Sequence, residues 1–189
     1  MASTKLPGAG KSSFELIDAA VLLAALRLKP GSTFLDLGCG AGRYTFPMAE
    51  VIGAGGLIYA LDLWEEGIAA VKQRATEECR NNIKTLFAEA GKIPLPAASV
   101  DTCLMATVLH DLVEAGTAVA ALTETARVLK PGGTLAIVEF DKVAGPPGPP
   151  VAIRLAPEDV ARLVTPYGFQ ETGGVRVGPY NYLIKFVKD

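Results

Sequence analysis

The residues with the clearest chemical meaning are three glycines, Gly38, Gly40 and Gly42, which follow a short apolar run. Glycine lets a backbone turn sharply, and it lets a ligand approach where a Cβ would stand in the way. Residues 34–37 are predicted to form a buried strand, and a helix is predicted over 43–52. A glycine loop between a strand and a helix lies where ligands bind in open α/β sheets. The pattern therefore predicts a nucleotide-like cofactor.

The spacing of these glycines disfavours the commonest nucleotide motifs. The dinucleotide fingerprint is GxGxxG, and its third glycine position is Arg43 here because Gly42 comes one place early. A P-loop at residues 8–12 is also disfavoured, since Lys5 stands where that motif needs its first glycine and no strand precedes it. NAD, FAD and a P-loop nucleotide therefore fit poorly.

Two carboxylates accompany the loop, and each has an alternative role. Asp36 lies inside the predicted strand, where an unpaired carboxylate is costly, so we expect it to bind the cofactor or to cap the amides of the glycine loop. Asp62 ends the second predicted strand, 20 residues after Gly42, where a carboxylate can accept both hydroxyls of an adenosine ribose. Its alternative is a cap for the helix beginning near Trp64 and Glu65. We favour cofactor binding for both.

Further polar residues follow the fourth and fifth predicted strands. His110 is the only histidine, and it is expected either to contact the acceptor and remove a proton or to be a packed residue without chemistry. Asp111 can cap the helix that follows. Glu139 and Asp141 face the mouth of a pocket or are solvated ends of a strand, and we favour the solvated ends.

Two other features have a plain and a chemical interpretation. Cys39 is interpreted as a small residue in a tight space rather than as a nucleophile, because no base or second cysteine is near it in the sequence. The proline-rich residues 146–150 with Arg154 are either a stiff linker, which we favour, or part of a lid that selects an anionic acceptor.

The elements that must position these residues follow from the apolar periodicity. From Thr33 onward, short and nearly continuous apolar runs alternate with helical patterns, which is typical of a parallel sheet covered by helices on both faces. Strands are expected at 34–37, 57–62, 83–88, 100–108 and 134–140, and helices at 43–52, 65–80 and 117–129. We predict a doubly wound, Rossmann-like α/β fold with a seven-stranded sheet.

The two ends of the chain depart from this alternation. Residues 1–12 are expected to be a flexible arm, and 13–31 to hold an N-terminal helix that starts at a capping box of Ser12 and Glu15. Residues 33–140 are the predicted cofactor-binding core.

Residues 141–189 are predicted to hold a loop, a helix at 157–167 and a terminal hairpin of strands 169–177 and 180–187. A connection as short as the one between those strands requires an antiparallel pair. The sheet should therefore be mostly parallel, with one antiparallel strand near the C-terminus.

Composition excludes several classes. The length of 189 residues suits a single domain, and 50% hydrophobic with 20% charged residues is too apolar for a disordered chain. A net charge of -2 offers no bulk positive field for nucleic acid. Uncharged stretches stay below the roughly 18 residues of a spanning helix, and the first thirteen residues lack a secretory apolar segment. Three cysteines without CxxC spacing favour a reducing compartment and disfavour a zinc site. We expect a cytoplasmic protein that binds neither nucleic acid nor membrane.

Five motifs occur in a fixed order along residues 33–140. They are Phe34 to Arg43, Ala60-Leu-Asp62, Ile93-Pro-Leu-Pro96 with Ser99-Val-Asp101, Thr107-Val-Leu-His110, and Arg127-Val-Leu-Lys-Pro-Gly-Gly-Thr-Leu135. Together they resemble class I S-adenosylmethionine-dependent methyltransferases, in particular the small group similar to ubiquinone/menaquinone-biosynthesis methyltransferases.

The resemblance implies S-adenosylmethionine as the cofactor and a role for each matching residue. The loop glycines would line its methionine portion, with Asp36 opposite the amino group and Asp62 on the ribose. Glu89 stands where the family usually has an aspartate that contacts the adenine. Thr107 and His110 would lie near the transferring methyl, with His110 as the catalytic candidate. The residues assigned to cofactor binding are Asp36, Gly38, Cys39, Gly40, Gly42, Asp62, Leu63, Glu89, Ala90 and Thr107, and no metal is expected.

The implied function is methyl transfer to a small-molecule acceptor by in-line displacement. A sulfonium methyl is already activated, so alignment and exclusion of water matter more than acid–base catalysis, and alignment alone can supply about 7–11 kcal/mol. Two alternatives stay open. One is a non-catalytic partner subunit that binds the cofactor, and the other is an NAD-dependent oxidoreductase.

Overall fold

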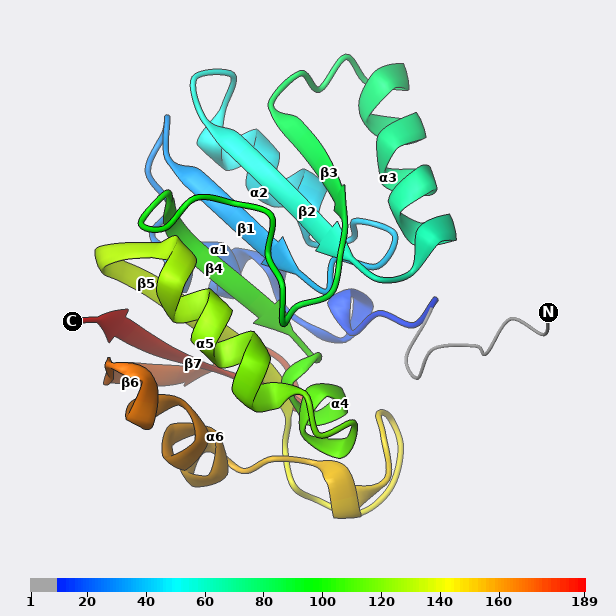
Figure 1. The fold of residues 1–189 in the computed structure, drawn as a ribbon. Helices are drawn as coiled ribbons and strands as arrows, with labels where there is room; N and C mark the ends of the chain where they lie inside the picture. Colours follow the sequence, from blue (N-terminus) through cyan, green and yellow to red (C-terminus); the bar gives the residue numbers. More distant parts are fainter. Residues whose placement is uncertain (1–9) are drawn as a thin grey trace, which may run out of the picture.

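A seven-stranded sheet forms the centre of the molecule in the computed structural model, which describes residues 10–189 (Figure 1). The strands lie in the order β3-β2-β1-β4-β5-β7-β6. Only β7 is reversed: it pairs antiparallel with both β5 and β6, and the other pairs are parallel. The predicted mostly parallel sheet with one antiparallel strand is confirmed. The strands are β1 Thr33–Leu37, β2 Leu57–Asp62, β3 Ile83–Phe87, β4 Val100–Ala106, β5 Leu129–Phe140, β6 Phe169–Arg176 and β7 Asn181–Lys188.

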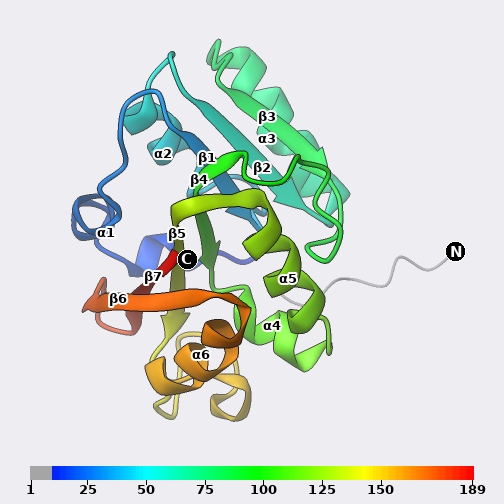
Figure 2. The same cartoon turned by 60° about the vertical axis from the view of Figure 1, so that its left-hand side comes forward.

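Helices cover both faces of this sheet (Figures 1 and 2). In the described part of the chain the α-helices are α1 Ala19–Leu26, α2 Thr45–Ile52, α3 Glu65–Glu77, α4 Leu109–Glu114, α5 Ala118–Val128 and α6 Pro157–Val164. Phe34 of β1 packs in the core with α1, α2 and α3, whereas Leu35 and Leu37 pack in the core with α4, α5 and α6. This alternation on a strand buried on both sides explains its continuous apolar run. The doubly wound arrangement is confirmed.

The N-terminal helix is shorter than predicted. Residues 1–9 of the expected flexible arm lie outside the described residues. The chain makes a single 3₁₀ turn at 14–16 before α1, which Asp18 caps by accepting hydrogen bonds from two amides of its first turn. The predicted capping box is wrong: Ser12 accepts only from the amide of Phe14, at 3.2 Å, and Glu15 pairs with Arg43 at 3.1 Å instead of reaching back.

Helix α4 was not predicted, and it changes the place of the residues after β4. The strand ends at Ala106 rather than at 108, and Thr107 turns the chain with a φ of +56°. His110 and Asp111 lie in the first turn of α4, so Asp111 does not cap the following helix as predicted. No helix in residues 10–189 is long and apolar enough to cross a membrane.

Candidate functional site

The glycine loop follows β1 and has a backbone that only glycine adopts readily. Gly38, Gly40 and Gly42 have φ values of +79°, +53° and +79°. The amides of Gly38 and Cys39 donate to the carbonyl of Leu61 at 2.8 and 3.0 Å, which ties the loop to the end of β2. A Cβ on Gly38 would lie 2.4 Å from Val108 Cγ2. The loop is therefore a cradle in which conformation favours glycine at all three positions, and space requires it at Gly38 as well.

Asp62 joins the glycine loop to the start of α3. Its Oδ2 accepts from the amide of Gly40 at 2.7 Å, and its Oδ1 accepts from the amide of Trp64 at 2.8 Å. The interaction with Trp64 is the cap that sequence reasoning weighed as an alternative. Each carboxylate oxygen has two lone pairs, so this half-buried side chain can still accept from a ligand hydroxyl. Ribose binding by Asp62 stays a prediction.

Asp36 lies beneath the loop and is only 1% exposed. Thr45 at the start of α2 donates to its Oδ2 at 2.6 Å. Burial raises the pKa of Asp36, the hydrogen bond from Thr45 lowers it, and the charge of Asp62 raises it, with a net result of about 7. A carboxyl group that titrates near neutrality can respond to a positive charge placed in the cradle.

The other residues assigned to the cofactor lie around the same edge of the sheet. Asp62 and Phe87 are partners in the β2–β3 register, so Leu63, Glu89 and Ala90 all follow the carboxyl ends of adjacent strands. Leu63 is 42% exposed and Glu89 is also exposed. Cys39 is buried, and burial raises the pKa of its thiol well above the usual range. This supports its interpretation as a small packing residue.

Sequence reasoning missed Ser13, whose buried hydroxyl contacts two residues far along the chain. Its Oγ lies 2.8 Å from the Tyr44 hydroxyl and 3.1 Å from Thr107 Oγ1. Phe14 packs edge-on against the Tyr44 ring at a centroid distance of 5.0 Å. The segment before α1 thereby reaches the turn after β4. A contact across 94 residues leaves no spacing pattern that could have revealed it.

His110 and Glu139 form a buried hydrogen-bonded pair where α4 meets the end of β5. Nδ1 of His110 lies 2.7 Å from Glu139 Oε2, and the amide of His110 donates to Glu139 Oε1 at 3.1 Å. Glu139 is completely buried, so the solvated strand end favoured from the sequence is wrong for this residue. Burial lowers the pKa of His110, but the hydrogen bond and charge of Glu139, with the charges of Asp111 and Glu114, raise it above its usual value.

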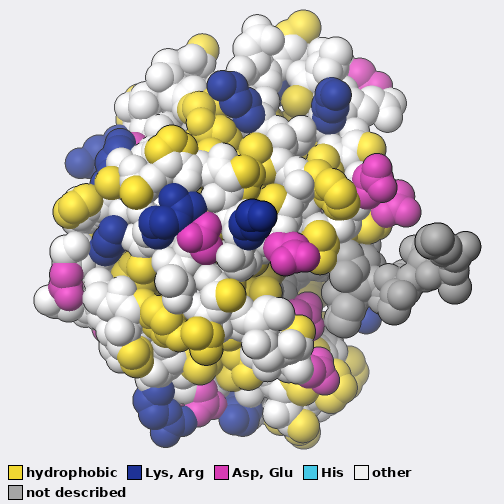
Figure 3. Space-filling view, viewed as in Figure 1, with side chains coloured by type: hydrophobic (Ala, Val, Ile, Leu, Met, Phe, Trp, Pro, Cys, Tyr) yellow, Lys and Arg dark blue, Asp and Glu magenta, His cyan; other side chains and the backbone are white. Residues whose placement is uncertain are grey.

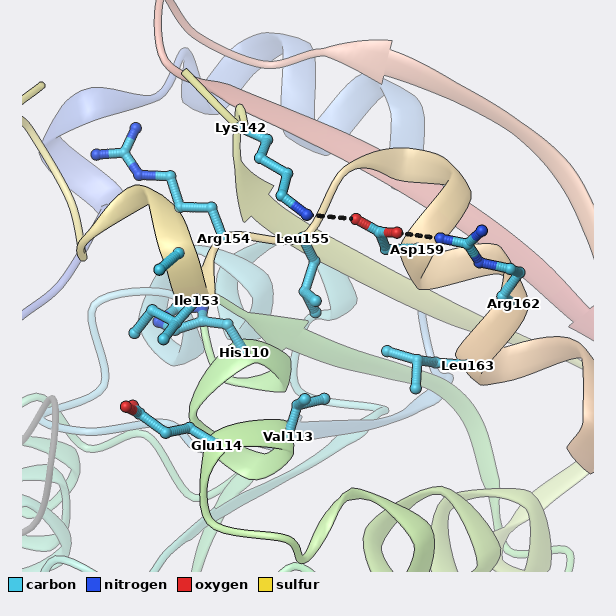
Figure 4. A pocket seen from close by; sticks show the side chains of 11 residues that line it. His110, Val113, Glu114, Lys142, Ile153, Arg154, Leu155, Asp159, Arg162 and Leu163 are labelled. Carbon is cyan, nitrogen blue, oxygen red and sulfur yellow. Dashed lines mark hydrogen bonds and ion pairs between the residues drawn. The ribbon is translucent and has the colours of Figure 1, made fainter. Parts of the chain in front are cut away.

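A hollow of about 440 Å³ opens beside His110, between α4, the 3₁₀ turn at 151–153 and α6 (Figure 4). Asp159 on its edge accepts from Lys142 at 3.0 Å and from Arg162. The guanidinium of Arg154 points away from the other labelled side chains, and backbone carbonyls take its N–H groups. The interpretation that Arg154 selects an anionic acceptor is therefore wrong. The lining residues are His110, Val113, Glu114, Lys142, Ala152, Ile153, Arg154, Leu155, Asp159, Arg162 and Leu163.

Comparisons with known proteins agree on the type of domain. The model of the methyltransferase domain family matches residues 35–137. A demethylmenaquinone methyltransferase of Lactococcus lactis is 34% identical over 109 residues, which are 58% of this chain and 42% of the relative. The chain thus spans about half the length of the curated relatives it matches.

Solved structures resemble all or most of the chain. A SAM-dependent methyltransferase from Aquifex aeolicus is 30% identical with a TM-score of 0.87, and the match covers 100% of both chains. The cyclase SpnF is 19% identical with a TM-score of 0.75, over 89% of this chain and 78% of that one. The second likeness concerns the fold alone.

Proposed function

Because the chain belongs to the methyltransferase domain family, we propose that it transfers the methyl group of S-adenosylmethionine to a small-molecule acceptor. Membership confirms the resemblance noted from the sequence, and it confirms S-adenosylmethionine as the cofactor of the family.

The observation that carries the activity is the meeting of the glycine cradle and the His110–Glu139 pair at one edge of the sheet. Leu37 lies opposite Met105 and Ala106 opposite Val138, so β1, β4 and β5 end together.

The donor set of the cradle fits this cofactor. Bound S-adenosylmethionine supplies an activated methyl group on a sulfonium. Gly40 leaves room for backbone contact with its amino-acid end, since a Cβ there would meet nothing within 4 Å, and Asp36 can face the ammonium group. Asp62 can accept from the ribose hydroxyls at the end of β2.

His110 is proposed as the base that removes a proton from the acceptor. Glu139 accepts the Nδ1 proton and thereby fixes the ring, and the basic nitrogen is then Nε2, which lies 3.5 Å from Asp111 Oδ1. The ring lines the hollow, so an acceptor there would lie within reach of it. A positioned base typically contributes about 10²- to 10⁴-fold to a rate.

The acceptor proposed for the hollow is a small, largely apolar molecule with an ionisable hydroxyl or ring carbon. The walls include Val113, Ile153, Leu155 and Leu163, and the side chains of Glu114, Lys142, Asp159 and Arg162 also line the hollow. The name of the Lactococcus lactis relative, a demethylmenaquinone methyltransferase, supports an acceptor of this kind. On the face in Figure 3, basic and acidic side chains are interspersed, which supports a small acceptor rather than nucleic acid. Three free cysteines support a reducing, cytoplasmic location.

The deciding experiment combines binding with turnover. Calorimetry measures the affinity for S-adenosylhomocysteine, and S-adenosylmethionine with a labelled methyl is then incubated with a panel of phenols, quinols and enols. Binding together with label transfer supports the proposal. Binding without transfer to any acceptor would favour a non-catalytic partner subunit, and thermal stabilisation by NAD(H) alone would favour an oxidoreductase. The turnover measurement is necessary because a cyclase shares this fold, so the fold alone does not establish methyl transfer.

A further inference from the structure

Residues 141–150 form a loop that has few hydrogen-bond donors of its own. Four of its ten residues are prolines, which have no N–H group. Backbone carbonyls need partners, and within this loop the amide of Val143 supplies one, donating to the carbonyl of Asp141 at 2.8 Å. The other carbonyls of the loop need hydrogen-bond donors from another part of the chain.

Arg154 donates to these carbonyls with all of its N–H groups. Its Nε donates to the carbonyl of Pro149 at 2.8 Å, and its two terminal nitrogens donate to four more carbonyls at 2.6–3.1 Å. A guanidinium has five N–H donors, so all are used. The accepting carbonyls belong to alternate residues of the loop: Asp141, Val143, Gly145, Pro147 and Pro149.

The loop therefore wraps around a buried cation. Arg154 is 3% exposed, and its Cζ lies 5.5 Å from the centroid of the Phe140 ring. Gly148 packs on the same ring, since a Cβ there would lie 2.7 Å from Phe140 Cδ1. Carbonyl dipoles and an aromatic face both stabilise a positive charge. A lysine has three donors on a single nitrogen and cannot satisfy five carbonyls.

We propose that Arg154 is a positioning residue that templates the 141–150 loop and so fixes the wall of the hollow opposite His110. In chain order, Lys142 is the first residue of this wall, and Ile153 and Leu155 come after the loop. The bonds from Arg154 to the carbonyls of Asp141 and Val143 connect the two ends. Helix α4 with His110 forms the facing wall (Figure 4). The inference rests on the proposed function only for what the hollow binds.

The test replaces Arg154 and then returns its guanidinium as a small ion. Backbone ¹⁵N order parameters report the loop at Val143, Ala144, Gly145 and Gly148, and the ring signals of the single histidine report the opposite wall. In Arg154→Ala we expect the order parameters to fall from about 0.85 to below about 0.6, together with a shift of the His110 signals. Arg154→Lys, which keeps the charge, should lose most of the order as well, so the test does not depend on one variant.

Ethylguanidinium at millimolar concentration, far below the molar denaturing range, should restore both signals in Arg154→Ala. Ethylammonium has the charge but only three donors, and N-ethylurea has the shape without the charge, so neither should restore them. Arg162→Ala is the matched control because Arg162 lines the hollow but bonds to Asp159.

An ordered loop in both Arg154 variants, or no effect of ethylguanidinium, would overturn the inference. Affinity for S-adenosylhomocysteine should stay within about twofold of wild type, since Arg154 does not contact the cradle. Loss of cofactor binding in the wild type would instead contradict the proposed function, so the two failures are distinguishable.

Discussion

The cofactor side and the acceptor side of the site are built in different ways. On the cofactor side, the backbone forms the site: three glycines shape the cradle, and Asp62 accepts hydrogen bonds from the amides of Gly40 and Trp64. On the acceptor side, side chains from separate elements meet. His110 reaches Glu139 across 29 residues, and Arg154 holds a loop that has no regular structure.

This difference decides what a sequence can reveal. A backbone cradle demands glycine at fixed positions, and that demand is visible as a motif. A pair of side chains brought together by the fold demands only that two elements end at the same place. The cofactor side should therefore tolerate few substitutions of its glycines, whereas the acceptor side should respond to the loss of single side chains.

The largest effect is expected on turnover from His110→Ala. If the ring removes the acceptor proton, kcat falls by about 10²- to 10⁴-fold while affinity for S-adenosylhomocysteine is unchanged. Arg162→Ala is the control, because Arg162 lines the same hollow from α6. Steady-state kinetics with the acceptor found by the panel provide the measurement. A kcat near that of wild type would exclude His110 as the base.

Gly38→Ala tests the cradle by stability. A left-handed φ costs a non-glycine residue about 1–2 kcal/mol, and overpacking against Val108 adds about 1–3 kcal/mol. Gly116→Ala is the matched control, since Gly116 has a φ of +71° and a Cβ there would meet nothing within 4 Å. Urea denaturation should show the larger loss of unfolding free energy for Gly38→Ala. Equal losses would mean that space is not limiting at the loop.

The sheet, its reversed strand and the glycine loop could be predicted because each depends on local periodicity or spacing. The buried state of Glu139 could not, because β5 and α4 bury it together and neither segment shows this alone. Ser13 and the role of Arg154 were missed for the same reason. The predicted capping box failed because α1 begins at Ala19, where the side chain of Asp18 caps the first turn.

Asp62→Ala should weaken binding of S-adenosylhomocysteine by roughly 10- to 150-fold, because a charge-assisted hydrogen bond worth about 1.5–3 kcal/mol is lost. Glu89→Ala changes an exposed carboxylate at the neighbouring strand end and should have a smaller effect. Calorimetry on both variants ranks the two contacts. Unchanged affinity in Asp62→Ala would remove this residue from the ribose site.

Asp36 predicts a pH dependence of cofactor affinity. Its pKa of about 7 means that much of it is protonated near neutrality, and a facing ammonium group would favour the carboxylate. Binding should then release a proton, and affinity for S-adenosylhomocysteine should rise roughly tenfold from about pH 6 to about pH 8. Asp36→Asn should abolish this rise. Calorimetry in buffers of different ionisation enthalpy counts the proton, and no release would contradict the contact.

The smallest effect is a shift in the titration of His110 in Glu139→Gln. Glutamine can still accept the Nδ1 proton but has no charge, so burial dominates and the pKa of His110 should fall below its wild-type value. Because the wild-type pKa is raised on folding, its stabilising contribution is present below about pH 6.5 and is lost as the pH rises through the folded pKa. The single histidine allows direct titration by NMR, and urea denaturation at two pH values checks the linkage. An unchanged titration midpoint of His110 would show that Glu139 orients the ring but does not raise its pKa. The acceptor side would then depend on geometry alone, as the glycine cradle does.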